Sequence, residues 1–363
     1  MIVDISYSGF KNIFHNEELY LPKRWDGRDF ISELRNLFDL YIDQLQKSPD
    51  ITTQTDDSSV EEEIRYLTNL IIQSTKDYLD GYPQKAYDTF AKLMSILDLK
   101  PFVDHTLHES FEPNKNPIIL YRAAKEKKYI SRTRMFHTPY NMRFRVPTCR
   151  YSIAGFPCLY LGTSLELCFS EIREVPRDYI LASAFQTTDS AIIQQKLLVF
   201  DLAVKPQDFE SNNRDDIRNN HNSLNKLSAD DRCAYLLWYP LIAACSFIRA
   251  FPSAPFAAEY IIPQLFMQWI RKKHPTIKGS ELTGVRYFSC ASIKASDMGY
   301  NYVFPTSGEK CPSDDRYCKY LIDDFSLTEP VFVHDYPSKE DCEDYLNKQQ
   351  FDLIVHNNNI EIS

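Results

Sequence analysis

Apolar residues recur at three- and four-residue steps through the first hundred positions, which is the period of an amphipathic helix. The clearest patterns cover residues 30–45, 64–78 and 84–99, and polar or turn-forming residues separate them. Such patterns are typical of helices that pack one apolar face against each other. We therefore predict a helical N-terminal domain over residues 1–100.

The pattern changes after a polar, proline-bearing stretch at residues 101–116, which we interpret as a linker. Short runs of β-branched and aromatic residues follow and predict strands, with helical patterns between them. A mixed α+β domain is therefore predicted over residues 117–335, with a C-terminal tail (336–363) that packs on it. The predicted strands are 117–122, 158–162, 196–202 and 285–291, and the predicted helices are 164–173 and 257–271.

The longest apolar run covers residues 233–248 and contains Pro240. It is shorter than the roughly 20 residues that a membrane-spanning helix needs, so we predict a buried core segment. The N-terminus lacks the basic and apolar regions of a secretory signal. We therefore expect no membrane association.

The charge and cysteine content narrow the function classes. With 41 Lys and Arg against 50 Asp and Glu, the net charge of −9 disfavours a surface built for nucleic acid. Nine cysteines occur without a C-x-x-C motif, which favours reduced thiols and a cytoplasmic location over disulfides or zinc. Only nine glycines are present, and no glycine-rich phosphate motif occurs. We accordingly expect no resident cofactor and no specific nucleic-acid partner.

Residues 150–173 contain the most informative local pattern. A turn precedes the strand CLYLG, in which Tyr160 points away from its leucine neighbours. Thr163 and Glu166 have the spacing of a capping box that opens the next helix. On that helix Glu171 lies at the edge of the apolar face, where the lip of a pocket would be. Taken alone, the pattern favours a surface glutamate that pairs with Arg173 or another basic residue.

Several ordered segments between residues 117 and 333 extend this pattern. They are LYRA with Arg122, RYS with Arg150, LYLG with Tyr160, SE with Glu171, EYIIPQLFMQWIR (259–271), GVRYFSCAS with Ser289 and FSLTEPV (325–331). Together they resemble the RES domain family, which is named for an arginine, a glutamate and a serine. The N-terminal hundred residues lie outside the likeness and look like the helical extension that some RES proteins carry.

The resemblance implies a fold similar to that of ADP-ribosyltransferases and an enzyme that consumes NAD+. Cleavage of the nicotinamide–ribose bond would proceed by phosphorolysis or hydrolysis, with NAD+ as substrate and inorganic phosphate as a co-substrate. Some RES proteins act as toxins of bacterial toxin–antitoxin pairs, so the resemblance also implies an antitoxin or other regulatory protein as partner. A homodimer formed through the helical extension stays open, as does the choice between toxin and phage-defence effector.

The resemblance also assigns the site residues, and their chemistry fits. A carboxylate at Glu171 would hold the ribose hydroxyls and stabilise the oxocarbenium-like charge. Guanidinium groups bind phosphate oxygens in pairs, and tyrosine and serine supply stacking or hydrogen bonds. The expected catalytic residues are Arg150, Glu171 and Ser289, and the expected ligand-binding residues are Arg122, Arg150 and Tyr160.

Each residue also has a purely structural interpretation. Arg122 could form an ion pair, Tyr160 could lie in the core, and Ser289 could satisfy its own strand. Three other functions stay open: ADP-ribosyl transfer to a macromolecule from the same pocket, a ribonuclease that uses Arg132 and His137, and a non-catalytic interaction module. We expect no metal, because His105-x-x-His108 and Cys311-x6-Cys318 lack the further ligands of a metal site.

Overall fold

A computed structural model describes residues 7–48, 60–97, 118–172, 176, 179–188, 198–209, 229–273, 282–308, 310 and 314–353. The chain divides into two compact units, each made from two stretches of sequence. The first contains residues 1–109 and 201–269, and the second contains residues 110–200 and 270–363. This division differs from the predicted one, which placed residues 201–269 with the strands. The predicted linker lies outside the described residues.

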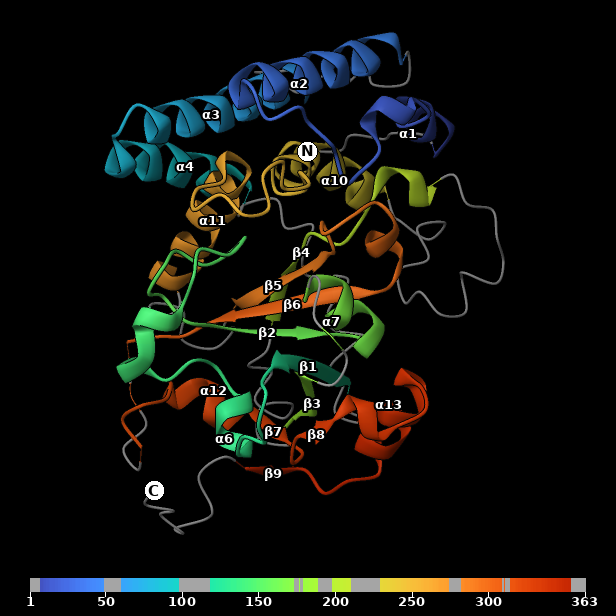
Figure 1. Cartoon of the computed structure of the whole chain (residues 1–363). Coiled ribbons are helices and arrows are strands. Elements are labelled where there is room, and N and C mark those ends of the chain that lie inside the picture. The colour runs from blue at the N-terminus through green and yellow to red at the C-terminus, as the bar shows by residue number, and fades with distance from the viewer. Residues whose placement is uncertain are drawn as a thin grey trace. The chain divides into compact units, whose positions relative to one another are not determined.

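The first unit is helical, as the apolar periodicity predicted for its N-terminal part (Figure 1). The side chain of Asp29 caps the second helix by accepting hydrogen bonds from the backbone N–H groups of Ile31 and Ser32. Its elements are α1 (Tyr7–Ile13), η1 (Glu17–Leu19), α2 (Phe30–Lys47), α3 (Val60–Leu79), α4 (Pro83–Leu97), η4 (Pro206–Phe209), α10 (Ala229–Ala244), η6 (Ala258–Tyr260) and most of α11 (Ile261–Lys273).

An aromatic core explains why residues 201–269 join this unit. In α10 every residue from 235 to 244 is buried, so the helix is covered on all sides. The ring of Tyr239 lies 4.5 Å from that of Tyr41 and 5.1 Å from that of Phe14. The Tyr41 hydroxyl donates to the Leu236 carbonyl at 2.9 Å, and the Tyr239 hydroxyl donates to the Leu19 carbonyl at 2.8 Å. These long-range contacts bind α10 to α2, to η1 and to Phe14 just after α1, and they confirm the predicted buried segment.

The second unit contains one sheet, which confirms the α+β class (Figure 1). Its described strands follow the order β4-β5-β6-β2-β1-β3-β7-β9, and β8 pairs with β3. They are β1 (Ile119–Lys125), β2 (Cys158–Gly162), β3 (Ile180–Thr187), β4 (Leu198–Asp201), β5 (Leu282–Phe288), β6 (Tyr300–Pro305), β7 (Phe325–Leu327), β8 (Val331–Phe332) and β9 (Asp352–Leu353).

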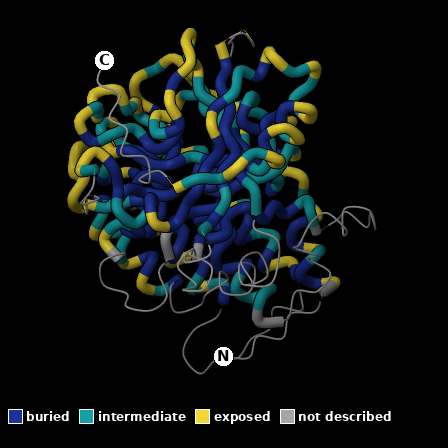
Figure 2. The backbone as a smooth tube through the Cα atoms, turned by 90° about the horizontal axis from the view of Figure 1, so that it is seen from below, coloured by how far each residue is buried: buried dark blue, intermediate teal, exposed yellow. Residues whose placement is uncertain are grey.

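Two helices cover part of one sheet face. Helix α7 (Leu165–Glu171) and helix α13 (Lys339–Asn347) bury Leu165 and Leu346 against Tyr121 and Ala182 of the sheet. Figure 2 colours such buried positions dark blue and exposed ones yellow. The shorter helices of this unit are α6 (Arg132–Met135), η2 (Tyr140–Arg145), η7 (Lys294–Asp297), α12 (Lys319–Asp324) and η8 (Val333–Asp335).

The start of α7 is joined to the start of β6 by Thr163. Its backbone N–H donates to the Tyr300 carbonyl at 3.0 Å, and its hydroxyl oxygen accepts from the Tyr300 N–H at 2.9 Å. The predicted capping box is therefore wrong: Ser164 is the cap, and its hydroxyl accepts from the Leu167 N–H at 3.2 Å. Gly299 makes this junction possible for two reasons. Its φ of +129° is one that other residues rarely adopt, and a Cβ there would lie 2.3 Å from the Thr163 hydroxyl oxygen.

Gly299→Ala should lower the free energy of unfolding by about 1–3 kcal/mol, because the new methyl group meets both a steric clash and a strained φ. Urea unfolding of the full chain measures the change. Gly155→Ala is the matched control: its φ is +82°, but its Cβ would have nothing within 4 Å. Equal losses in the two variants would contradict the proposed clash with Thr163.

Candidate active site

Glu171 ends helix α7 with an exposed side chain that two buried groups hold in place. Its Oε1 accepts a hydrogen bond from the Ser289 hydroxyl at 2.6 Å and another from the Asn301 side-chain amide at 2.8 Å. Ser289 is fully buried, and Asn301 is 6% exposed. Among the described residues, Oε2 of Glu171 has no hydrogen-bond partner. One carboxylate oxygen is thus fixed while the other stays available to a ligand.

Strand register brings these three residues together. Asn301 of β6 pairs with Gly162 of β2 on one side and with Tyr287 of β5 on the other. Ser289 lies two positions beyond Tyr287 and so points to the same face of the sheet. The Ser289 oxygen accepts from the Ala291 N–H at 3.2 Å, which leaves the hydroxyl proton for Glu171. The structure therefore places the predicted Glu171 and Ser289 in direct contact.

Asn301 is a site residue that the sequence analysis missed. The predicted strands did not include β6, and no motif singled this residue out. The available signal was a polar amide next to the apolar and aromatic run Tyr302–Phe304 of a buried strand, where an unpaired polar group would be costly. The carboxylate of Glu171 removes that cost.

Arg150 lies in a tight turn close to this cluster. The turn is closed by two backbone hydrogen bonds between Cys149 and Ser152, at 2.9 and 3.2 Å. Arg150 is 8% exposed. Burial raises the pKa of the Cys290 thiol to about 11. The positive charge of Arg150 lowers this pKa, and the negative charge of Glu171 raises it. Both charged groups therefore lie near the Cys290 thiol, which stays protonated at neutral pH.

Tyr160 connects strand β2 to the turn that carries Arg150. Its hydroxyl lies 2.7 Å from the Ser152 hydroxyl. Burial raises the pKa of Tyr160 well above its usual value, so the phenol stays neutral. The residue is half-buried, whereas its neighbours Leu159 and Leu161 are buried, as the alternating pattern predicted. The ring is thus partly accessible, and its hydroxyl helps to hold the turn.

Arg122 lies on β1 and is half-buried, and it has no described contact with Glu171. Burial lowers its pKa, an effect opposed by Cys168, Cys149 and Tyr160. Its Nη1 atom is buried without a hydrogen-bond partner among the described residues, and no described carboxylate forms an ion pair with it. A buried guanidinium with an unpaired nitrogen is costly, and such groups call for an explanation such as a bound anion or a functional role.

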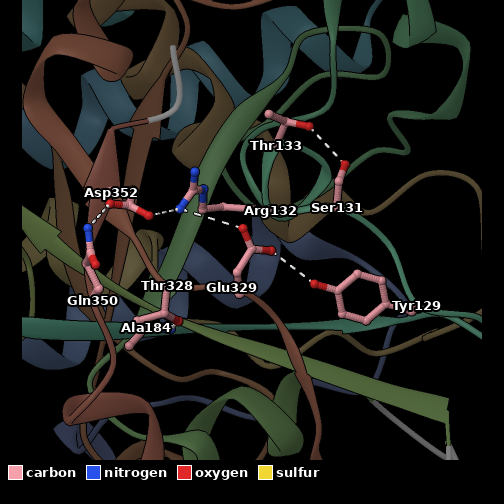
Figure 3. Close-up of polar contacts among 9 residues, drawn as sticks. All are labelled: Tyr129, Ser131, Arg132, Thr133, Ala184, Thr328, Glu329, Gln350 and Asp352. Atoms are coloured by element: carbon pink, nitrogen blue, oxygen red, sulfur yellow. Dashed lines mark hydrogen bonds and ion pairs between the residues drawn. The ribbon is translucent and has the colours of Figure 1, made fainter. Parts of the chain in front are cut away.

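The pair Arg132 and His137 is engaged in structural contacts. Arg132 Nη1 donates to Asp352 at 2.5 Å and lies 3.6 Å from Oε1 of Glu329 (Figure 3). The other carboxylate oxygen of Glu329, Oε2, accepts a hydrogen bond from the Tyr129 hydroxyl at 3.0 Å. This network connects α6 to β9 at the sheet edge. The hydrogen bond from Arg132 lowers the pKa of Asp352.

His137 is fully buried, and both ring nitrogens are hydrogen-bonded. Nδ1 lies 2.9 Å from the Thr138 carbonyl, and Nε2 accepts from the Cys318 N–H at 2.9 Å. Burial lowers the pKa of His137 to about 4. A neutral, buried histidine without a free nitrogen is poorly suited to general acid–base catalysis at neutral pH, which disfavours the ribonuclease alternative.

Metal ligation finds no support in the part of the chain that the structure describes, where no group of three metal-ligating side chains comes together. His105, His108 and Cys311 lie outside that part, and Cys318 is buried next to Ser307. None of the helices within the described ranges combines the length and apolarity needed to cross a bilayer.

The comparisons with known proteins give a relative but no family. No family model matches the chain, and no solved structure matches it. A protein of Bacillus subtilis (strain 168) named "Putative toxin YopC" is 28% identical over 329 residues, which cover 89% of this chain and 70% of that protein. The resemblance to the RES family and to the ADP-ribosyltransferase fold therefore stays a prediction.

The low pKa of His137 makes stability depend on pH. In the unfolded chain His137 is protonated below about pH 6.5, whereas in the folded chain it is protonated only below about pH 4. Its contribution to stability is therefore lost as the pH falls from 6.5 to 4. Between pH 7 and 4.5 the loss should be about 2–3 kcal/mol in urea unfolding, and His137→Gln should remove that component. An unchanged pH dependence in His137→Gln, like that of the control His334→Gln, would contradict this prediction.

Proposed function

We propose that this chain is a toxin that degrades NAD+ by breaking the nicotinamide–ribose bond, with inorganic phosphate or water as the acceptor. The observation that carries the proposal is the exposed Glu171 carboxylate, held by Ser289 and Asn301 with one oxygen available. The Bacillus subtilis relative, whose printed name describes a toxin, supports the broader part of the proposal.

A single held carboxylate suits this reaction. In NAD+ the nicotinamide ring is a positively charged pyridinium. It departs as a neutral molecule that takes the bonding electron pair, so no general acid is required. The ribose carbon becomes positively charged, and a fixed carboxylate stabilises that charge. The second oxygen of the carboxylate accepts a hydrogen bond from a ribose hydroxyl. Ordinary glycosidases need a second carboxylate because their leaving group must be protonated. The Glu171 cluster supplies what the reaction needs.

Two arginines, the buried Arg150 and the half-buried Arg122, supply positive charge for the anionic partners. Arg150 lies near the Glu171 cluster, where a guanidinium can bind the phosphates of NAD+ or an attacking phosphate ion. Arg122 lies near Tyr160 and Cys149 and has an unpaired nitrogen among the described residues. In phosphorolysis a phosphate oxygen forms the new bond to the ribose carbon; in hydrolysis water does so and releases a proton.

Glu171→Gln should lower the rate of NAD+ loss by at least about 100-fold, because the charge that stabilises the transition state disappears. The melting temperature should stay unchanged, since the glutamine amide oxygen can still accept from Ser289 and Asn301. Chromatography of NAD+ and its products measures the rate. Asn301→Ala should cause a smaller loss, because it releases the carboxylate without removing it.

Glu166→Gln is the matched control for this experiment. Glu166 lies on the same helix but is exposed and forms an ion pair with Lys339. Its variant should keep the rate of the unmodified protein. The proposal fails if Glu171→Gln degrades NAD+ as fast as Glu166→Gln does.

A further inference from the structure

A pocket of about 270 Å³ lies at the other end of strands β2 and β6 from Glu171. Cys158 pairs with Pro305 at this end, four positions along β6 from Asn301, which at roughly 3.3 Å per residue is about 13 Å away. The pocket is lined by Arg143, Phe156, Pro157, Arg271, Pro305, Thr306, Ser307 and Gly308. Its volume is just below the roughly 300 Å³ where drug-sized sites begin, so it suits a ligand smaller than a dinucleotide.

The pocket has two guanidinium groups and no carboxylate in its lining. Arg271 donates to the Pro157 carbonyl at 2.9 Å and to the Cys158 sulfur at 3.3 Å, so its position is fixed. Arg143 is exposed and stacks on the Tyr140 ring at 4.8 Å. No carboxylate of the described residues pairs with either arginine. The pocket therefore favours an anionic ligand.

An aromatic face completes the lining. Phe156 is 47% exposed, and the Arg271 guanidinium lies 5.3 Å from its ring centre. Hydrogen bonds hold the turn before it, from Gly155 N–H to the Val146 carbonyl and from Phe156 N–H to the Ile153 carbonyl, both at 3.0 Å. A half-exposed ring on a fixed turn can stack on the planar ring of a ligand.

The segment that carries Arg143 is fixed to the same pocket. The Tyr140 hydroxyl donates to the Ser307 carbonyl at 2.5 Å, and the Tyr140 N–H donates to the Arg316 carbonyl at 2.8 Å. These bonds hold η2 against the strand end. Of the basic residues between 125 and 145, Arg143 therefore contributes its charge to the pocket lining.

We propose that this pocket binds a phosphorylated planar ring of mononucleotide size, with the phosphate on Arg143 and Arg271 and the ring on Phe156. The site lies at the other end of β2 and β6 from Glu171, so its ligand is bound there without being turned over by the Glu171 cluster. The proposal does not depend on NAD+ cleavage.

Gly308 offers a sharp test. A Cβ there would meet no atom of the described residues within 4 Å, and its φ lies outside the left-handed region, so a side chain fits among these residues. Gly308→Glu places a carboxylate at the edge of the pocket, while Gly308→Gln adds the same volume without charge. Isothermal titration with AMP should show at least tenfold weaker binding to Gly308→Glu than to Gly308→Gln. Arg143→Ala should weaken binding likewise, whereas Arg145→Ala, on the same helix but outside the lining, should not.

Three further titrations complete the design. Adenosine and inorganic phosphate should each bind at least tenfold more weakly than AMP, and Glu171→Gln should bind AMP as the unmodified protein does. The absence of AMP binding, or equal affinities of Gly308→Glu and Gly308→Gln, would overturn the proposal. Weaker AMP binding by Gly308→Glu, together with unchanged NAD+ cleavage by the same variant, separates this site from the catalytic one.

Discussion

The antiparallel pairing of β2 with β6 is the constraint on which both sites depend. At one end it sets Asn301 opposite Gly162, and Thr163 then fixes the start of α7 so that Glu171 returns over Asn301. At the other end the Thr306 hydroxyl donates to the Pro157 carbonyl at 3.0 Å and joins two residues that line the pocket with Arg143 and Arg271. A slip of one residue would turn Asn301 to the opposite face and remove the hydrogen bond to Glu171.

Burial decides which groups near Glu171 carry charge. It raises the pKa of Cys290 to about 11 and the pKa of Tyr287 well above its usual value, so both stay neutral at physiological pH. The exposed Glu171 and the buried Arg150 are then the charged groups of the cluster. Their opposite signs suit a substrate that develops positive charge at its sugar and carries negative charge on its phosphates.

Local patterns predicted the elements, whereas long-range pairing decided their grouping. The periodicity of residues 30–45 correctly indicated α2, and the apolar run around Pro240 correctly indicated a buried segment. Helix α10 belongs with the N-terminal helices because of contacts such as the hydrogen bond from Tyr239 to Leu19. These residues lie 220 positions apart, so a pattern read over a short stretch of sequence does not reveal the contact. Likewise the resemblance indicated Glu171 and Ser289, but Asn301 required the register of β6, and Thr163 proved to bind Tyr300 rather than cap α7.

The most direct test of the account is the loss of NAD+ when it is incubated with the purified full chain, with and without inorganic phosphate. We expect nicotinamide to be released in stoichiometric amounts with the loss of NAD+. A phosphorylated ADP-ribose formed only with phosphate identifies phosphorolysis, and free ADP-ribose in both conditions identifies hydrolysis. ADP-ribose recovered only as an adduct on a macromolecule, or NAD+ that stays intact, would contradict it.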